Sequence, residues 1–232
     1  MQNSFNIEKL EEAIGYSFKN KALLEQAVTH SSYANERMIN KHKDYERIEF
    51  LGDAVLENVS SEFIYFKYPD MSEGNMTKLR ASLVCEMALA FSAKALNLGE
   101  YILLGKGEEK NGGRERDSII ADVTEAIIGA IYLDAGLDEA KRFIYEYILN
   151  DIENKKLFYD CKTSLQELMQ KKGKKVNYIL IDENGPEHMK EFLVEVLIDN
   201  VCMGRGKGKN KKEAEQKAAL EALLLLKKNI RD

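Results

Sequence analysis

The chain has 232 residues, of which 44% are hydrophobic and 31% charged, and its formal net charge is −5 at pH 7. This composition is typical of a globular protein and excludes a largely disordered chain. The N-terminal segment lacks the apolar core of a signal peptide, and the longest apolar run near the end, "AALEALLLL", is too short to span a bilayer, so we expect a cytoplasmic protein with no membrane partner.

Most of the chain before residue 150 has helical spacing. Apolar residues recur every three or four positions in "IEKLEEAIG", "KALLEQAVTHSSYA", "LVCEMALAFSAKAL" and "DEAKRFIYEYILND". The glycines of "LGKGEEKNGGRERD" indicate a long loop before the next helix. We therefore predict an all-α domain over residues 1–150.

The helix expected at "YERIEFLGDAVLENV" carries an acidic stripe opposite its apolar face. The stripe consists of Glu46, Glu49, Asp53 and Glu57. One interpretation is a solvated polar face. However, acids three or four residues apart repel one another, and Gly52 in the same segment costs the helix about 1 kcal/mol relative to alanine. A multivalent cation would relieve the repulsion.

A second helix is expected in "DSIIADVTEAIIGAIYLDAG", with Asp117 or Ser118 capping its start and Gly136 its end. Its residues are apolar on nearly every side, which predicts a buried helix. Asp122 and Glu125 lie three apart within it and so share one face. Two buried carboxylates side by side require a compensating interaction.

Two explanations of this pair remain open. The carboxylates could form ion pairs with Arg114, Arg116 or a lysine of another helix. Alternatively, they could meet Glu49 and Asp53 in the core of the helical domain. Four carboxylates without His or Cys would favour Mg²⁺, with Mn²⁺ as a possible substitute, and could promote attack of water on a phosphate.

Other candidate sites are weaker. His30 in "AVTHSSY" could act as a general base, although a structural hydrogen bond is the more common role. The sequence contains no P-loop, dinucleotide fingerprint or Ser-His-Asp order, so we expect no nucleotide cofactor. Cys85, Cys161 and Cys202 are widely separated, which indicates reduced packing residues and not disulfides or a zinc site.

The pattern changes after residue 159. A short helix in "CKTSLQELMQKK" ends at Gly173, and "VNYILID", "EFLVEVLID" and "VCMGRGKG" have strand patterns, with "ENGPEH" as a turn. The strong helix "KKEAEQKAALEALLLLKK" follows. We predict a linker over residues 151–160 and a small α+β domain, ordered α-β-β-β-α, over residues 161–232.

Charge also divides the chain. Residues 160–232 contain 15 Lys and Arg against 12 Asp and Glu, whereas residues 1–159 contain 19 against 27. The basic residues cluster in "KKGKK" at 171–175 and again in 205–212. The C-terminal part could therefore hold a polyanion on which the acidic part acts.

These segments resemble one family. "ERIEFLGDAVL" is similar to the signature of ribonuclease III, and "YPDMSEGNMTKLRASLVCE" and "GEEKNGGRERDSIIADVTEAIIGAIYLDAG" resemble its other two blocks, in the same order. The resemblance covers essentially the whole chain. It implies an endonuclease domain followed by a double-stranded RNA-binding domain, acting as a homodimer that cuts both strands of duplex RNA with Mg²⁺.

The resemblance also implies roles for the acids. By position, Glu49, Asp122 and Glu125 would bind the metal, and Asp53 and Glu125 would be the residues most directly needed for hydrolysis. The products would carry 5′-phosphate and 3′-hydroxyl ends with short 3′ overhangs. Glu46 would be structural or near the dimer contact, and Glu57 lies beyond the motif.

RNA-binding residues follow from the same resemblance. Gln166 and Gln170 would face a minor groove from a helix, and Pro186 and His188 would reach the next minor groove from a loop. Lys211 and Lys212 would meet phosphate at a helix N-terminus.

Two positions depart from the family pattern. Ser31 stands where a basic residue is usual, and Asn210 replaces the common serine before the paired lysines; neither alters the four acids. We therefore expect an endoribonuclease that processes ribosomal RNA precursors and structured messenger RNA. The alternative is a duplex-RNA-binding protein without catalysis, which would leave the repulsion among the acids uncompensated.

Overall fold

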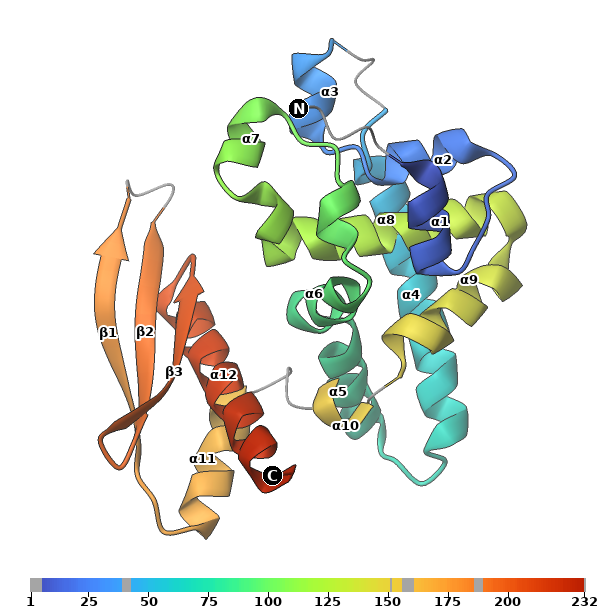
Figure 1. Cartoon of the computed structure of the whole chain (residues 1–232). Coiled ribbons are helices and arrows are strands. Elements are labelled where there is room, and N and C mark those ends of the chain that lie inside the picture. The colour runs from blue at the N-terminus through green and yellow to red at the C-terminus, as the bar shows by residue number, and fades with distance from the viewer. Residues whose placement is uncertain (1–5, 39–42, 151, 156–160, 186–189, 232) are drawn as a thin grey trace. The chain divides into compact units, whose positions relative to one another are not determined.

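The computed structural model describes residues 6–38, 43–150, 152–155, 161–185 and 190–231. The chain forms two compact units, Met1–Ile152 and Glu153–Asp232. Figure 1 shows the elements of both units, which are described separately below.

The regular secondary structure of the described residues in the first unit is helical, apart from one isolated β-bridge. Short 3₁₀ turns at Leu98–Tyr101 and Gly113–Glu115 and a π-helical turn at Ile144–Ile148 supplement its α-helices. The α-helices are α1 (Ile7–Ile14), α2 (Lys21–Ala27), α3 (Ser31–Glu36), α4 (Glu46–Lys67), α5 (Glu73–Val84), α6 (Glu86–Ala95), α7 (Lys106–Lys110), α8 (Asp117–Ala135) and α9 (Leu137–Phe143), with α10 (Ile152–Lys155) at the boundary between the units. The prediction of an all-α fold for this part is confirmed.

Two apolar runs that the sequence presented as continuous are each split between helices. The run 21–34 is interrupted after α2 because Val28 and His30 exchange backbone hydrogen bonds with Leu103, at 2.8 and 3.0 Å. The run 83–96 is interrupted at Cys85, whose backbone is extended, with φ −69° and ψ 158°. Tertiary pairing and one extended residue therefore override the local periodicity.

The segment predicted as a long loop contains α7 and a 3₁₀ turn. Arg114 holds this segment in place, because its guanidinium donates hydrogen bonds to the backbone carbonyl groups of Gly99, Glu100 and Ile102. Glycine content correctly indicated irregular backbone but missed the short helix.

Helix α8 forms the centre of the core. Eleven of its residues are buried, in agreement with its apolar sequence. It ends at Gly136, as predicted, where φ is +87°. Its start was predicted wrongly: Arg116 is the N-cap residue and no side chain caps the helix, because Asp117 already has helical geometry and forms an ion pair with Lys94 at 2.6 Å.

Helices α4 and α8 cross each other with their backbones in direct contact (Figure 1). An ideal Cβ atom at Gly52 would lie 1.8 Å from the carbonyl oxygen of Glu125, and one at Gly129 would lie 2.3 Å from that of Ile48. Only glycine fits at either position. The glycine that weakens α4 as an isolated helix is thus required for this crossing.

The second unit has the predicted α-β-β-β-α order. Its elements are α11 (Cys161–Lys171), β1 (Val176–Asn184), β2 (Glu191–Ile198), β3 (Val201–Gly208) and α12 (Lys211–Arg231). The antiparallel sheet has the order β1-β2-β3, with Val176 opposite Ile198 and Ile198 opposite Val201. Gly204 and Gly206 let α12 pack directly on β3, since a Cβ atom at either would meet the helix backbone.

None of the described helices is long and apolar enough to cross a membrane. The cysteines are free thiols, but they are not uniformly packing residues. Cys161 is buried and Cys85 is half-buried, whereas Cys202 is exposed. The expectation of a packing role is therefore wrong for Cys202, which lies near the start of β3, on an edge strand of the sheet.

Candidate functional site

The crossing of α4 and α8 places the predicted acids on neighbouring turns. Glu49 and Asp53 flank Gly52 on α4, and Gly52 lies against the backbone of Glu125 on α8. Asp122 is one turn earlier on α8, on the same face as Glu125. The fold therefore brings together two acidic pairs that are about 70 residues apart in the sequence.

The sequence interpretation placed these acids within the core, but they lie at its edge. Glu49, Asp122 and Glu125 are half-buried, and Asp53 is exposed. Their helix backbones belong to the core, but their carboxylates face outward. Solvent and a ligand can therefore reach the acids.

Burial and the neighbouring carboxylates together raise the pKa values of two of these acids. Burial, and then the charges of Asp122, Glu46 and Asp53, raise the pKa of Glu49 to about 7. Burial, and then the charges led by Asp53 and Glu49, raise the pKa of Glu125 to about 8. Without a cation, these two carboxyl groups would hold protons near neutral pH, at which ordinary glutamates are ionised.

Tyr45 adds a polar contact to this group that sequence reasoning did not find. Its hydroxyl donates to Asp122 Oδ2 at 3.3 Å, and burial raises the pKa of this phenol well above its usual value. Tyr45 also anchors the start of α4, because its backbone N–H donates to the carbonyl of Thr29 at 2.9 Å. Tyr45 and Asp122 are 77 positions apart in the sequence, so no local pattern could reveal their hydrogen bond.

The acids suit a divalent cation by chemistry and charge. Oxygen donors without nitrogen or sulfur are the ligands that Mg²⁺ and Mn²⁺ prefer. In the described part of the chain, no three His, Cys, Asp or Glu side chains are arranged closely enough to hold a metal ion. The donor set therefore fits a divalent cation by its chemistry, although the side chains are not arranged around one.

Arg114 and Arg116, two of the partners that the sequence allowed for the acids of α8, form ion pairs with acids near α7. Arg114 pairs with Glu109 through two hydrogen bonds, at 2.5 and 2.7 Å. Arg116 pairs with Glu108 at 2.7 Å. Both arginines therefore serve the α7 segment, and the charges that raise the pKa of Glu125 are all carboxylates.

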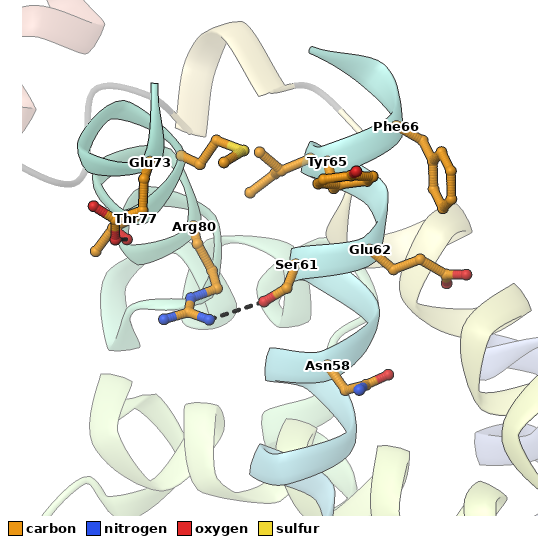
Figure 2. Close-up of a pocket in the computed structure, with 10 residues that line it drawn as sticks. Asn58, Ser61, Glu62, Tyr65, Phe66, Glu73, Thr77 and Arg80 are labelled. Atoms are coloured by element: carbon orange, nitrogen blue, oxygen red, sulfur yellow. Dashed lines mark hydrogen bonds between the residues drawn. The ribbon is translucent and has the colours of Figure 1, made fainter. Parts of the chain in front are cut away.

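The other two acids of the stripe differ from this group. Glu46 is exposed at the start of α4. Glu57 lies 3.5 Å from Arg80 of α5, which also donates a hydrogen bond of 2.8 Å to Ser61 (Figure 2). Glu57 thus has a cationic partner, although its charge still contributes to the raised pKa of Glu125.

His30 has a structural role. It is the N-cap residue of α3, where Nδ1 accepts from the Ser32 N–H at 3.1 Å and lies 2.7 Å from the Ser32 hydroxyl oxygen. The same hydroxyl accepts from the N–H of Gly105 at 2.9 Å. The more common of the two predicted roles, a structural hydrogen bond, is therefore the one observed.

The second unit presents the described part of the predicted RNA-binding set at its surface. Gln166 and Gln170 are exposed one turn apart on α11, and Lys211 and Lys212 are exposed at the first turn of α12. Pro186 and His188 lie outside the described residues. The four described members of the set, two glutamines and two lysines, are therefore accessible to a large ligand.

The residues of the basic run 205–212 differ in their contacts: those on β3 form ion pairs, whereas Asn210 caps the next helix. On β3, Arg205 pairs with Glu195 at 2.6 Å and Lys207 pairs with Glu191 at 3.3 Å. Asn210 directly precedes α12, and its side chain accepts from the N–H of Glu213 at 2.9 Å. Asparagine therefore caps this helix as serine would, and the departure from the family pattern preserves the position of the lysines.

Comparisons with known proteins follow the same division of the chain. A family model described as Ribonuclease-III-like matches residues 20–152, and the Double-stranded RNA binding motif matches residues 161–226. Proteins named Ribonuclease 3 from Bacillus cereus (strain G9842) and Bacillus anthracis (strain CDC 684 / NRRL 3495) are each 50% identical over 223 residues, which cover 95% of this chain and 91% of theirs. The chain belongs to the ribonuclease III family. It is a ribonuclease III-type endoribonuclease with a double-stranded RNA-binding domain.

A solved structure agrees with this assignment for the first unit. The nuclease domain of ribonuclease III from Campylobacter jejuni is 48% identical and superposes with a TM-score of 0.58. The match covers 62% of this chain and 96% of that domain. Dependence on a divalent metal is typical of the family.

Proposed function

We propose that the acids at the α4–α8 crossing form the hydrolytic centre of this endoribonuclease, with Mg²⁺ as the metal. The observation that supports this most directly is the convergence of Glu49 and Asp53 with Asp122 and Glu125 across the contact at Gly52. Mutual repulsion at this point is a cost to the folded protein unless a cation offsets it.

In this proposal, Glu49, Asp122 and Glu125 hold the metal. When bound, Mg²⁺ supplies Lewis-acid chemistry that offsets the charge developing on the phosphate. Mn²⁺, which accepts the same oxygen ligands, would substitute for it.

Asp53 and Glu125 act most directly on the reaction. The exposed Asp53 carboxylate accepts a hydrogen bond from the attacking water and so orients its oxygen toward phosphorus. As the new P–O bond forms, the water passes a proton to the Asp53 carboxylate; the bond from phosphorus to O3′ breaks, and O3′ takes a proton from solvent. The products are a 5′-phosphate and a 3′-hydroxyl.

The substrate contacts are proposed on the second unit. Gln166 and Gln170 would contact 2′-hydroxyl groups in one minor groove, and Pro186 and His188 would reach the next. Phosphates would meet Lys211 and Lys212 at the N-terminus of α12, where free backbone N–H groups also favour an anion. Structured ribosomal and messenger RNA precursors are the expected substrates.

We also propose a homodimer that acts in the cytoplasm. Phe50, between the candidate ligand Glu49 and Leu51, is 80% exposed, and Tyr65 and Phe66 of the same helix are 64% and 74% exposed. Tyr65 and Phe66 border a groove of about 420 Å³ between α4 and α5, beside Arg80 (Figure 2). The similar Campylobacter domain is described as having a region involved in dimer formation. Sedimentation velocity measures whether the protein is a monomer or a dimer. The free thiols are compatible with a reducing compartment such as the cytoplasm.

The test uses the full chain and a long RNA duplex, with Mg²⁺ or with EDTA. Asp53→Asn and Glu125→Gln should each reduce cleavage by roughly 10²-fold or more while leaving duplex affinity in EDTA unchanged. Glu57→Gln is the matched control. It removes an acid of the same stripe, but one that already pairs with Arg80. Cleavage by Asp53→Asn at the wild-type rate would refute the assignment. Equal binding in both buffers with intact RNA would favour a non-catalytic duplex-binding protein.

A further inference from the structure

The run "KKGKK" at residues 171–175 lies beside a groove, and the proposed function assigns no role to its lysines. The groove lies between the last turns of α11 and the start of β1 and has a volume of about 350 Å³. The amides of Gln166 and Gln170 line it together with Lys174, Lys175 and Asn177. Its lining therefore combines hydrogen-bonding amides with cations.

The backbone at the end of α11 is tightly fixed. Gly173 adopts φ +68°, and its N–H donates to the carbonyl of Gln170 at 3.0 Å. The N–H of Lys174 donates to the carbonyl of Met169 at 2.9 Å. This pair of bonds satisfies two terminal carbonyl groups that would otherwise repel an anion near the groove.

The other side of the loop is held by the turn between β2 and β3. Asp199 Oδ1 accepts from the N–H of Lys175 at 3.1 Å, and the N–H of Asp199 donates back to the carbonyl of Lys175 at 3.0 Å. Asp199 and Asn200 have φ values of 49° and 68°, as in a tight hairpin turn. The groove is therefore preorganised, which lowers the entropy lost when a ligand binds.

The charge around the groove is strongly positive. Lys171, Lys172, Lys174 and Lys175 are all exposed. Within the described residues, the one ion pair of this run joins Lys174 to Asp199 at 3.6 Å, and both side chains are about half exposed. Two lysines that line the groove, and two more at the end of α11, favour an extended polyanion.

We propose that this groove binds the sugar–phosphate backbone of duplex RNA beside the minor groove contacted by Gln166 and Gln170. This inference rests on the proposed RNA-binding role of α11 and extends it. The amides that line the groove face a minor groove, and phosphates border every minor groove, so a cationic loop directly beyond the amides meets them. Lys175, which lines the groove, and Lys172, which is exposed directly before Gly173 at its edge, supply the phosphate contacts, while Lys174 supports the loop through Asp199.

The test measures affinity for a short RNA duplex against salt concentration, in EDTA to prevent cleavage. The variant Lys172→Ala/Lys175→Ala retains Lys174 and both backbone anchors. Loss of two phosphate contacts should flatten the slope of log K against log salt by roughly 1.8, and weaken binding roughly tenfold or more near physiological salt.

The matched control is Arg205→Ala/Lys207→Ala. It removes the same net charge from β3, where both residues are already paired with acids of β2. This control should change the slope little. Equal losses in the two variants would overturn the proposal, because net charge alone would explain them.

Two further measurements separate the possible failures. Circular dichroism melts of both variants should match the wild type, since the backbone contacts of the loop are retained. If wild type binds duplex RNA and the Lys172→Ala/Lys175→Ala variant binds it equally at every salt concentration, the groove proposal fails while duplex binding stands. If wild type does not bind duplex RNA, the proposed function itself fails. An equal loss for single-stranded RNA of the same sequence would overturn the duplex assignment.

Discussion

Replacement of Gly52 by alanine tests whether the α4–α8 crossing builds the active site. As an isolated helix, α4 should gain about 1 kcal/mol from this change. In the folded protein, the new Cβ atom would lie 1.8 Å from the Glu125 carbonyl oxygen and 2.9 Å from the Gly129 nitrogen. Because real Cβ contacts are essentially never under 3.0 Å, the helices must separate by about 1.2 Å. The two effects have opposite signs, so the experiment decides between them.

The steric effect should dominate, since both contacts are to backbone, which cannot rotate away. Overpacking of this kind costs about 1–3 kcal/mol and sometimes more, so we expect Gly52→Ala to lower the free energy of unfolding by about 2 kcal/mol. The same shift moves Glu49 and Asp53 away from Glu125. A misplacement of about 1 Å can reduce a catalysed rate about 10²-fold.

Urea unfolding followed by circular dichroism measures the first effect, and duplex cleavage with Mg²⁺ measures the second. Gly74→Ala is the matched control, because it makes the same change in α5 at a position with no atom within 4 Å of the new Cβ. It should be neutral or slightly stabilising and leave cleavage intact. A Gly52→Ala protein as stable and active as wild type would show that the crossing is not tight.

Two further predictions concern the acids and the α12 cap. Because the folded-state pKa values of Glu49 and Glu125 are raised from 4.5 to about 7 and about 8, the metal-free protein should lose stability as pH rises from about 4.5 through 8. Mg²⁺ should restore more stability at pH 8.5 than at pH 6, as measured by thermal unfolding; a Glu125→Gln protein with the same pH dependence as wild type would contradict this. Asn210→Ala should cost about 1 kcal/mol by removing the N-cap of α12 and weaken duplex binding in a filter assay, whereas Asn210→Ser should restore both. Equal effects of the two substitutions would refute the capping role.

Sequence patterns succeeded where one local interaction decided the outcome. The strand β2 and the capped end of α8 at Gly136 follow from alternating β-branched residues and from a glycine at the end of an apolar run. They failed where a distant contact intervened. The run 21–34 looked continuous, but pairing with Leu103 interrupts it. Asp117 looked like a cap, but it is the first residue of the helix and pairs with Lys94.

The candidate site shows the same limit. The spacing of the acids placed each pair on one helix face, and the family resemblance selected Glu49, Asp53, Asp122 and Glu125 from the stripe. Burial was overestimated, because an apolar helix can still turn one polar face outward at the edge of the core. The Tyr45 hydrogen bond to Asp122 was not foreseen, since it joins residues that only the fold brings together.

The sequence by itself determined the two-part organisation, the secondary structure of the RNA-binding unit and the acids, because periodicity, charge and motifs are local properties of the chain. Only the tertiary structure showed that Gly52 allows α4 to contact α8 closely and that a groove lies beside "KKGKK". A glycine contact across 73 residues, and a loop held by Asp199 of a distant hairpin, depend on backbone atoms that meet after folding. Local patterns carry no record of which backbones will touch.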